Sequence, residues 1–199
     1  SNLSSADRVW VNTPRRFSSF YRIMKREIGI VDPVSMSINC GQFDLGCNSI
    51  HFLDLLSWLN NSELVDVKTM IDGGWYAAKR AGYKEFKGEV RGYYANGAYL
   101  SIKNTDISQN EMLIEYDVRG RRFRLDENNG FKLTGENFGG RVEYQSEITA
   151  PLVERILSFT MTDELPTLNE SLQQHFLFFG DLSKSYSLVS FNDDEVPIT

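Results

Sequence analysis

Between residues 64 and 134 this sequence contains six short segments in which apolar and polar residues alternate. A period of two places successive side chains on opposite faces of a β-strand, so each segment is predicted to be a strand with one buried face. Asn96-Gly97, Arg119-Gly120 and Asn129-Gly130 lie between segments, and Asn and Gly tolerate the positive φ of tight turns. The pattern predicts a meandering, mainly antiparallel sheet. The predicted strands are Val65–Ile71, Glu85–Tyr94, Ala98–Lys103, Met112–Val118, Arg121–Leu125 and Phe131–Thr134.

Helical patterns flank this run of strands. Phe17 to Ile28 repeats apolar residues at i, i+3, i+4, i+7 and i+11, which predicts an amphipathic helix. Asp44 to Leu59 predicts a loop followed by a largely buried helix that ends at Asn60-Asn61. In the last helix, Thr167 is expected to form a capping box with Glu170. The remaining predicted elements are strands at Arg8–Asn12 and Pro33–Asn39 and helices at Glu147–Phe159 and Thr167–Phe179.

The predicted order is a strand and a helix, a second strand and helix, a run of strands, and two helices. This order predicts an α+β fold in which the helices pack on one face of an open, mainly antiparallel sheet. The opposite face is then either solvated or covered by another subunit, and we expect a homo-oligomer formed through it. The apolar residues that favour a second subunit are Tyr93, Tyr94, Tyr99, Ile102, Ile114 and Tyr116.

Composition narrows the classes of protein that fit. The chain has 199 residues, of which 41% are hydrophobic, and a formal net charge of -6 without blocks of like charge, which argues against a nucleic-acid partner. Its apolar stretches, such as Phe52–Leu59, are much shorter than the roughly 20 residues of a membrane span, and no secretory signal opens the chain. Cys40 and Cys47 are therefore expected to be free thiols in a reducing cytoplasm.

Several catalytic signatures are absent from the sequence. It contains no GxGxxG turn, P-loop, HExxH or paired CxxC, so neither a dinucleotide-binding turn nor a metal site is encoded. Only His51 and His175 could serve a Ser-His-Asp triad, and no GxSxG elbow presents a serine. We expect a solvated or capping role for His175. The chain alone is a poor candidate for a complete enzyme.

One dense polar cluster interrupts the apolar sequence between residues 44 and 54. On a helix, Asn48, His51 and Asp54 fall at i, i+3 and i+6, within one third of the circumference. An imidazole with a carboxylate within a turn can be held in one tautomer and exchange a proton with a hydroxyl or carbonyl. The alternative is that His51 and Asp54 satisfy each other and nearby backbone in the core.

Each of two basic pairs in the sequence can be interpreted in two ways. Arg15-Arg16 follow the first predicted strand, and either face a ligand at the carboxyl end of the strand or start a solvated helix. Lys79-Arg80 follow Gly73-Gly74-Trp75 in a polar, aromatic loop. They either bind an anionic group through charge-assisted hydrogen bonds or face solvent, as most loops do.

Three motifs together point to a family. Val11–Lys25 contains Asn-x-x-Arg-Arg before a helix, Gly46–Leu59 reads GCNSIHFLDLLSWL, and Leu165–Ser171 reads LPTLNES. Over nearly the whole chain these motifs resemble the glucose-fructose oxidoreductase and inositol dehydrogenase (Gfo/Idh/MocA) family. Trp75–Gly88 and the last four residues, VPIT, are similar to members associated with surface-polysaccharide and nucleotide-sugar metabolism.

The resemblance implies a two-domain NAD(P)-dependent oxidoreductase that acts on a sugar or nucleotide sugar. An N-terminal Rossmann domain would hold NAD or NADP and pack against a C-terminal α+β domain that binds substrate and forms oligomers. The chain would begin at the last Rossmann strand, so the fragment alone is expected to be inactive and to bind no cofactor. Residues 1–7 are small and polar and are expected to be a tag remnant or disordered start. The resemblance divides the rest into 8–30, the end of the Rossmann domain; 31–180, the C-terminal domain; and 181–199, a tail.

The resemblance also implies roles for single residues. The family histidine, which exchanges a proton with the substrate hydroxyl as hydride moves to the nicotinamide, corresponds to His51. Many members have Asp four residues before this histidine, where this chain has Cys47. That departure favours an alternative, a non-catalytic binding or oligomerisation module that keeps the fold without dehydrogenase chemistry. The residues expected near the substrate are Asn48, Asp54, Arg16, Lys79 and Arg80.

Overall fold

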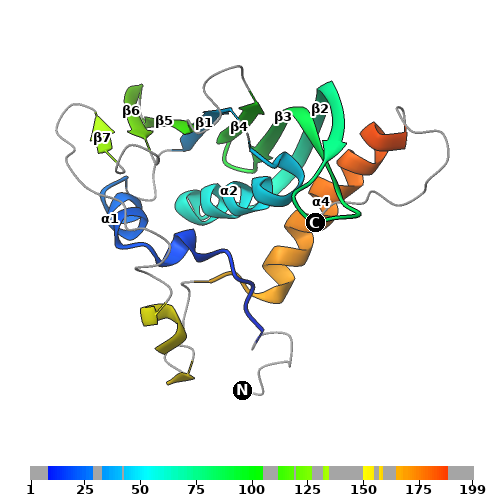
Figure 1. Ribbon diagram of the computed structural model, residues 1–199. Helices are drawn as coiled ribbons and strands as arrows, with labels where there is room; N and C mark the ends of the chain where they lie inside the picture. Colours follow the sequence, from blue (N-terminus) through cyan, green and yellow to red (C-terminus); the bar gives the residue numbers. More distant parts are fainter. Residues whose placement is uncertain are drawn as a thin grey trace.

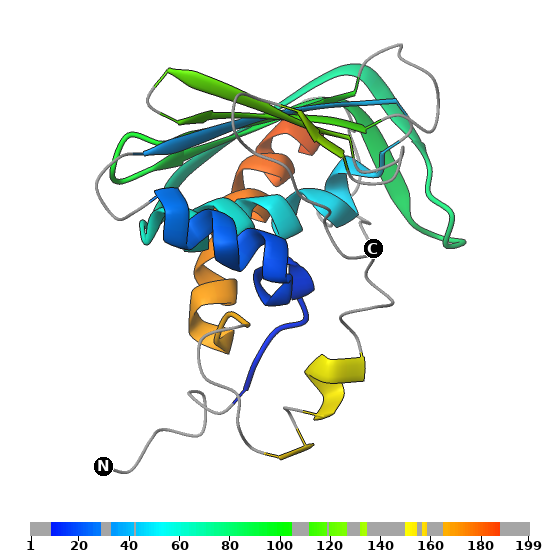
Figure 2. The same ribbon diagram turned by 90° about the vertical axis from the view of Figure 1, so that its left-hand side faces the viewer.

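The computed structural model of the chain describes residues 9–28, 33–41, 43–104, 112–118, 120–126, 132–134, 150–154, 157–158 and 165–187. Its centre is a seven-stranded sheet in the order β2-β3-β4-β1-β5-β6-β7, with helices packed on one side (Figures 1 and 2). Of the neighbouring pairs only β1 and β4 run parallel, so the predicted α+β fold with a mainly antiparallel sheet is confirmed. The strands are β1 Val34–Cys40, β2 Leu64–Ala77, β3 Lys84–Tyr94, β4 Tyr99–Asn104, β5 Met112–Val118, β6 Arg121–Asp126 and β7 Lys132–Thr134.

The helical layer lies on one face of this sheet. Its elements are the 3-10 helix η2 Pro14–Phe17 and the α-helices α1 Ser19–Ile28, α2 Leu45–Asn60 and α4 Leu168–Ser187. Helix α2 is apolar on most of its surface because it packs against the sheet as well as against α1 and α4, and Phe52, Leu53 and Leu55 are completely buried. It ends where Asn61 takes the left-handed conformation, a common helix stop, as the Asn60-Asn61 pair predicted.

Three tyrosines hold the helices against the sheet. The Tyr94 hydroxyl of β3 donates to the Leu53 carbonyl at 2.9 Å, and the hydroxyls of Tyr21 in α1 and Tyr116 in β5 lie 3.1 Å apart. Helix α1 therefore belongs to the same core as the sheet. Helix α4 covers the edge of β2, where the Thr69 N–H donates to Asp181 Oδ2 at 2.6 Å and Ser185 Oγ donates to the Thr69 carbonyl at 3.1 Å.

Most of the apolar residues that we expected to contact a second subunit lie on the face of the sheet that the helices cover. Ile102 and Ile114 are completely buried, and Tyr94 and Tyr116 point toward the helices as described above. Of the six residues named, Tyr93 and Tyr99 lie on the open face, with ring centroids 5.4 Å apart. Alternation predicts that successive residues face opposite sides of the sheet, but it does not predict which side the helices cover.

The ends of the chain differ from the predicted elements. The strand predicted at Arg8–Asn12 is wrong in its described part, which forms only an isolated antiparallel bridge between Trp10 and Thr167. Helix α4 continues past the predicted end at Phe179 to Ser187, so the proposed boundary at residue 180 falls inside a helix. Its extension is explained by Leu182 and Tyr186, which are buried one and two turns beyond Phe178.

The remaining turn and helix predictions are tested only in part. Thr167 and Glu170 form the predicted capping box, with Thr167 N–H donating to Glu170 Oε2 at 2.7 Å and Glu170 N–H donating to Thr167 Oγ1 at 3.3 Å. Gly97 and Gly120 have the expected positive φ. Of the helix predicted at Glu147–Phe159, residues 150–154 are helical, while Asn129-Gly130 lie outside the described residues.

Candidate functional site

The candidate site begins at the N-terminus of α2. The Glu85 carboxylate of β3 accepts hydrogen bonds from the N–H groups of Gly46, at 2.6 Å, and Cys47, at 3.0 Å. These two donors belong to the first turn of the helix, which has no partner of its own for them. The Tyr76 hydroxyl of β2 donates to Asp44 Oδ1 at 3.4 Å, so the end of the β2–β3 hairpin is fastened to the start of α2.

Burial is the main cause of the pKa shifts near the start of α2. It raises the pKa of Glu85, and the nearby Asp44 carboxylate raises it further, while the two backbone N–H donors oppose the rise. Burial also raises the pKa of the Cys40 thiol to about 12, so this thiol is protonated at neutral pH. Cys40 and Cys47 are both free, as predicted. Sequence reasoning missed Glu85, because an acidic residue in a strand usually lies on the solvated face.

His51 lies in the middle of α2, half-buried on the side that faces η2 and α4. Burial, followed by the charges of Arg15 and His175, lowers the pKa of His51 to about 4. Among the residues that the structure describes, its Nδ1 atom has no hydrogen-bond partner. His51 is therefore a neutral imidazole at neutral pH, with one ring nitrogen uncommitted within the described part of the chain.

Asp54 is not the partner of His51, so the alternative in which these two side chains satisfy each other is wrong. Its carboxylate accepts hydrogen bonds from Arg16 Nε at 2.8 Å and Thr13 Oγ1 at 2.8 Å, and the Arg16 Nη2 group donates to the second oxygen. Burial raises the pKa of Asp54, whereas the charge and hydrogen bonds of Arg16 and Thr13 lower it. Arg16 Nη1 also lies 3.6 Å from Glu170 Oε1 of α4.

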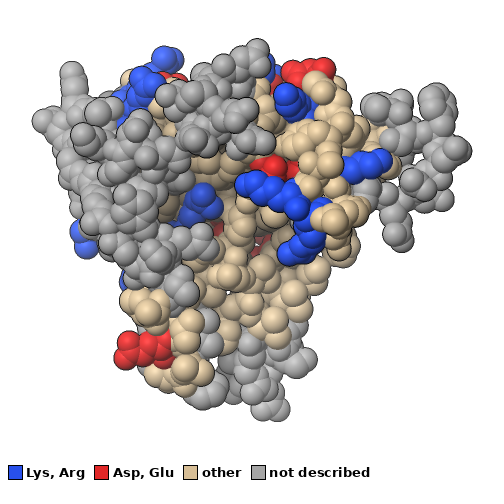
Figure 3. Space-filling model, in the orientation of Figure 1, with Lys and Arg blue, Asp and Glu red and all other residues tan. Residues whose placement is uncertain are grey.

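The remaining residues considered in the sequence analysis are His175, Lys79, Arg80 and Asn48. His175 is half-buried on α4, where its Nδ1 lies 2.7 Å from the Ser171 carbonyl and its ring packs on Phe179. Lys79 and Arg80 are exposed in the turn of the β2–β3 hairpin, and Figure 3 shows Lys and Arg side chains gathered over that hairpin, next to an acidic side chain. Asn48 lies on α2 one turn before His51. The structure thus brings Arg16 and Asp54 together but does not join Lys79 or Arg80 to them.

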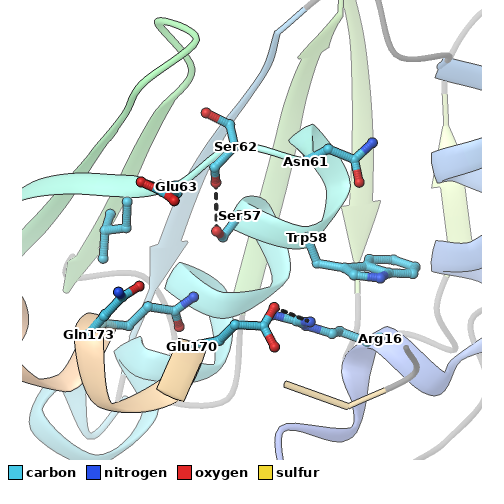
Figure 4. Close-up of a pocket in the computed structure, with 10 residues that line it drawn as sticks. Arg16, Ser57, Trp58, Asn61, Ser62, Glu63, Glu170 and Gln173 are labelled. Atoms are coloured by element: carbon cyan, nitrogen blue, oxygen red, sulfur yellow. Dashed lines mark hydrogen bonds and ion pairs between the residues drawn. The ribbon is translucent and has the colours of Figure 1, made fainter. Parts of the chain in front are cut away.

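A separate cavity of about 250 Å³ lies at the other end of α2, between that helix and the start of α4 (Figure 4). No motif of the sequence pointed to it. Its residues come from two segments, 57–64 and 170–174, and from Arg16, and none of them forms a recognisable pattern alone. The lining residues are Arg16, Ser57, Trp58, Asn61, Ser62, Glu63, Leu64, Glu170, Gln173 and Gln174.

Neither a metal site nor a membrane span is found among the residues that the structure describes. Within the described ranges, no group of three or more His, Cys, Asp or Glu side chains is arranged to hold a metal ion. The same part of the chain has no helix long and apolar enough to cross a membrane.

Comparison with solved structures identifies the fold. The WlbA dehydrogenase of Bordetella pertussis, solved in complex with NADH and UDP-GlcNAcA, is 17% identical, with a TM-score of 0.55 over 91% of this chain and 61% of its own. UDP-N-acetylglucosamine 3-dehydrogenase of Acidithiobacillus ferrooxidans is 14% identical, with a TM-score of 0.56 over 87% and 59%. A super-repressor mutant of Gal80p from Saccharomyces cerevisiae is 16% identical, with a TM-score of 0.57 over 92% and 64%.

These similarities establish the fold of the chain. The solved structures are of the Gfo/Idh/MocA oxidoreductase type, so the fold implied by the sequence resemblance is confirmed. The chain spans about three fifths of the length of these structures. A scan of the sequence against protein-family models finds no match, and a search among curated proteins finds none either.

Proposed function

We propose that the chain is the substrate-binding part of an NAD(P)-dependent oxidoreductase that acts on a sugar or nucleotide sugar, in the cytoplasm and in surface-polysaccharide biosynthesis. The observation that carries the proposal is His51, a half-buried imidazole whose pKa is lowered to about 4 and whose Nδ1 is unpartnered among the described residues. A neutral imidazole can accept a proton from a substrate hydroxyl during oxidation and return it during reduction. The two similar nucleotide-sugar dehydrogenases support this substrate class.

The surroundings of His51 suit this role. Arg15 has its guanidinium 4.0 Å from the centre of the Phe52 ring, and its charge favours the neutral imidazole. The buried Arg16–Asp54 pair holds η2 against α2 and so keeps Arg15 in place, which makes it a positioning pair in this proposal. Asn48, one turn before His51, is proposed to hydrogen-bond a second sugar hydroxyl.

Lys79 and Arg80 are proposed to bind an anionic part of the substrate, such as the diphosphate of a nucleotide sugar. Both are exposed, and the hairpin that carries them is fastened to the start of α2 through Glu85 and Tyr76. An exposed turn with two cations suits a charged group at the rim of a site better than the reacting atoms at its centre.

The described residues do not by themselves fit a nicotinamide dinucleotide. They contain no glycine-rich turn between a strand and a helix, and the parallel pair β1–β4 is not joined by such a unit. In our proposal NAD or NADP is held by a Rossmann domain of the same protein that packs against this chain. The chain on its own would then show no dehydrogenase activity.

A second candidate function is a binding module without catalysis. Cys47 stands where the resemblance leads us to expect Asp, and a thiol lacks the two oxygen acceptors of a carboxylate. The same fold also occurs in Gal80p, which one of the solved structures describes as a transcriptional regulator. Isothermal calorimetry of the whole protein with NAD⁺, NADH and their phosphorylated forms separates the two candidates, because a catalytic protein binds at least one of them.

The experiment that tests His51 uses the whole protein, nucleotide sugars and either cofactor. His51→Ala and His51→Gln are expected to lower kcat by about 100-fold or more, within the usual range for loss of a general base, while cofactor binding stays unchanged. Ser183→Ala, on the far part of α4, is the matched control. Full turnover of His51→Ala would show that the proton is exchanged by another group.

Self-association through the open sheet face is part of the proposal. The face carries the Tyr93 and Tyr99 rings beside a salt bridge between Arg91 and Glu89 at 2.7 Å, a mixture typical of a moderately polar interface. Light scattering of the chain is expected to give a dimer or larger species. Tyr99→Asp, on this face, should shift it to monomer, and a wild-type monomer at high protein concentration would rule the interface out.

A further inference from the structure

The cavity at the C-terminal end of α2 is a second candidate binding site. In Figure 4, Trp58 and Arg16 lie on one side of it and Glu63 and Gln173 on the other. Trp58 follows His51 by seven residues on α2, so the two positions are about 10 Å apart along the helix axis. The Arg16–Asp54 pair lies between these two positions along the helix. The cavity is thus separate from the proposed catalytic position.

Two residues that line the cavity each carry an unsatisfied buried polar atom. Gln174 is 6% exposed, and its Oε1 has no hydrogen-bond partner among the residues that the structure describes. The indole Nε1 of Trp58 is buried and unpartnered in the same described part of the chain. A buried polar group without a partner costs about 1–3 kcal/mol, so two such groups beside one cavity need an explanation.

The two unpartnered atoms need opposite kinds of hydrogen-bond partner. Gln174 Oε1 accepts a hydrogen bond, and Trp58 Nε1 donates one. A hydroxyl group can donate and accept at once, so a ligand with neighbouring hydroxyls can satisfy both atoms. The terminal torsion of a glutamine amide is broad, so rotation about it can turn the Gln174 amide toward the ligand.

Charge and size limit the ligand further. Arg16 is the only cation among the lining residues, and its guanidinium is already paired with Asp54 and Glu170. Glu63 and Glu170 make the cavity unfavourable for a phosphate or a carboxylate. About 250 Å³ equals the volume of about eight liquid waters, which suits one sugar ring and is less than the usual drug-sized pocket.

We propose that this cavity binds a neutral monosaccharide unit, with Gln174 and Trp58 as its two buried hydrogen-bonding contacts. Lys25 Nζ lies 4.3 Å from the centre of the Trp58 ring and covers one face of the indole. Gln173, Asn61 and Ser62 supply further amide and hydroxyl groups around the cavity. The site does not depend on the chemistry proposed for His51, and it would be present in either candidate function.

The test follows the indole N–H resonance of Trp58 in a ¹H–¹⁵N spectrum while methyl β-D-glucopyranoside is added. Trp58→Phe assigns this resonance among those of the three tryptophans. We expect a saturable shift with the glucoside and none with inorganic phosphate. A saturable shift with phosphate, or no shift with the glucoside, overturns the proposal.

Gln174→Leu has nearly the same volume and lacks the acceptor, so it should weaken glucoside binding about tenfold or more. The variant should also unfold at a higher temperature than the wild type, because it removes an unsatisfied buried group. His51→Ala and Asn39→Leu, the latter on the open sheet face, should bind as the wild type does. Unchanged binding by folded Gln174→Leu, or loss of binding in His51→Ala, would place the ligand elsewhere.

Discussion

The guanidinium of Arg16 donates to both carboxylate oxygens of Asp54, and the two side chains are only 4% and 2% exposed. This pair joins η2 to the middle of α2 across 38 residues of sequence. A third hydrogen bond, from Thr13, satisfies the same carboxylate. Because both charges are buried, the loss of either partner leaves the other without compensation.

Asp54→Asn is therefore expected to lower the free energy of unfolding by about 3–5 kcal/mol, the range for breaking a buried ion pair. Denaturant titration of the chain measures this loss. Glu170→Gln is the matched control, since Gln keeps the capping box. It loses the half-exposed 3.6 Å ion pair to Arg16 and the favourable charge in the first turn of α4, at a combined cost of about 1 kcal/mol. Equal costs for the two variants would contradict the central role of the pair.

His51 predicts a pH dependence of stability. Its pKa is about 4 in the folded chain and 6.5 ordinarily, so below pH 6.5 the unfolded chain binds the proton more readily. Stability should fall as the pH drops from about 6.5 to about 4, by roughly 3 kcal/mol in total, and this contribution should level off below. The difference in stability between wild type and His51→Gln, measured at each pH, isolates it from the carboxylates.

The same imidazole can be titrated directly by NMR. Its measured pKa should lie well below 6.5 and should rise in His175→Gln, because the charge of His175 is one cause of the lowering. Phe176→Ser, a change on the exposed side of α4, should leave it unchanged. A wild-type value near 6.5 would mean that His51 is solvated and would remove the basis of the proposed proton exchange.

Local signals in the sequence were enough for most of the fold. Period-two alternation predicted β1, β3 to β7 and the first part of β2, the Asn60-Asn61 pair predicted the end of α2, and the Thr167–Glu170 capping box predicted the start of α4. Each of these depends on neighbours a few residues apart, where sequence spacing and spatial contact coincide. The loop predicted at Gly73-Gly74-Trp75 is wrong, because β2 continues to Ala77.

The site was predicted less completely, because its contacts join distant segments. His51 and Arg16 were both named, but the pairing of Arg16 with Asp54 spans 38 residues and the contact of Glu85 with Gly46 spans 39. The Trp58–Gln174 cavity needs α2 and α4 side by side, which no periodicity reveals. Alternation likewise does not predict which face of the sheet the helices cover. For this reason Tyr94 and Tyr116 were expected on the open face, although their hydroxyls bind α2 and α1.

Glu85 is expected to stabilise the start of α2. Glu85→Ala leaves the N–H groups of Gly46 and Cys47 without their acceptor and should cost about 2 kcal/mol of unfolding free energy. Glu85→Gln keeps one acceptor oxygen but loses the favourable charge at a helix N-terminus, at about 1 kcal/mol. Denaturant titrations of both variants check the order, and a larger loss for Gln than for Ala would contradict it.

Gly88 is the backbone position of β3 that should tolerate substitution least. Its φ is +150°, and an added Cβ would lie 1.8 Å from the Met70 carbonyl oxygen, an atom of the paired strand β2 that cannot move away alone. Gly88→Ala should therefore cost about 4 kcal/mol or more, or prevent folding. Gly97→Ala is the matched control, because Gly97 also has a positive φ, of +85°. A Cβ at Gly97 would meet nothing within 4 Å, so only about 1 kcal/mol of backbone strain is expected. Thermal unfolding of the two variants, followed by circular dichroism, measures the difference, and similar melting temperatures would show that β2 and β3 are not paired in this register.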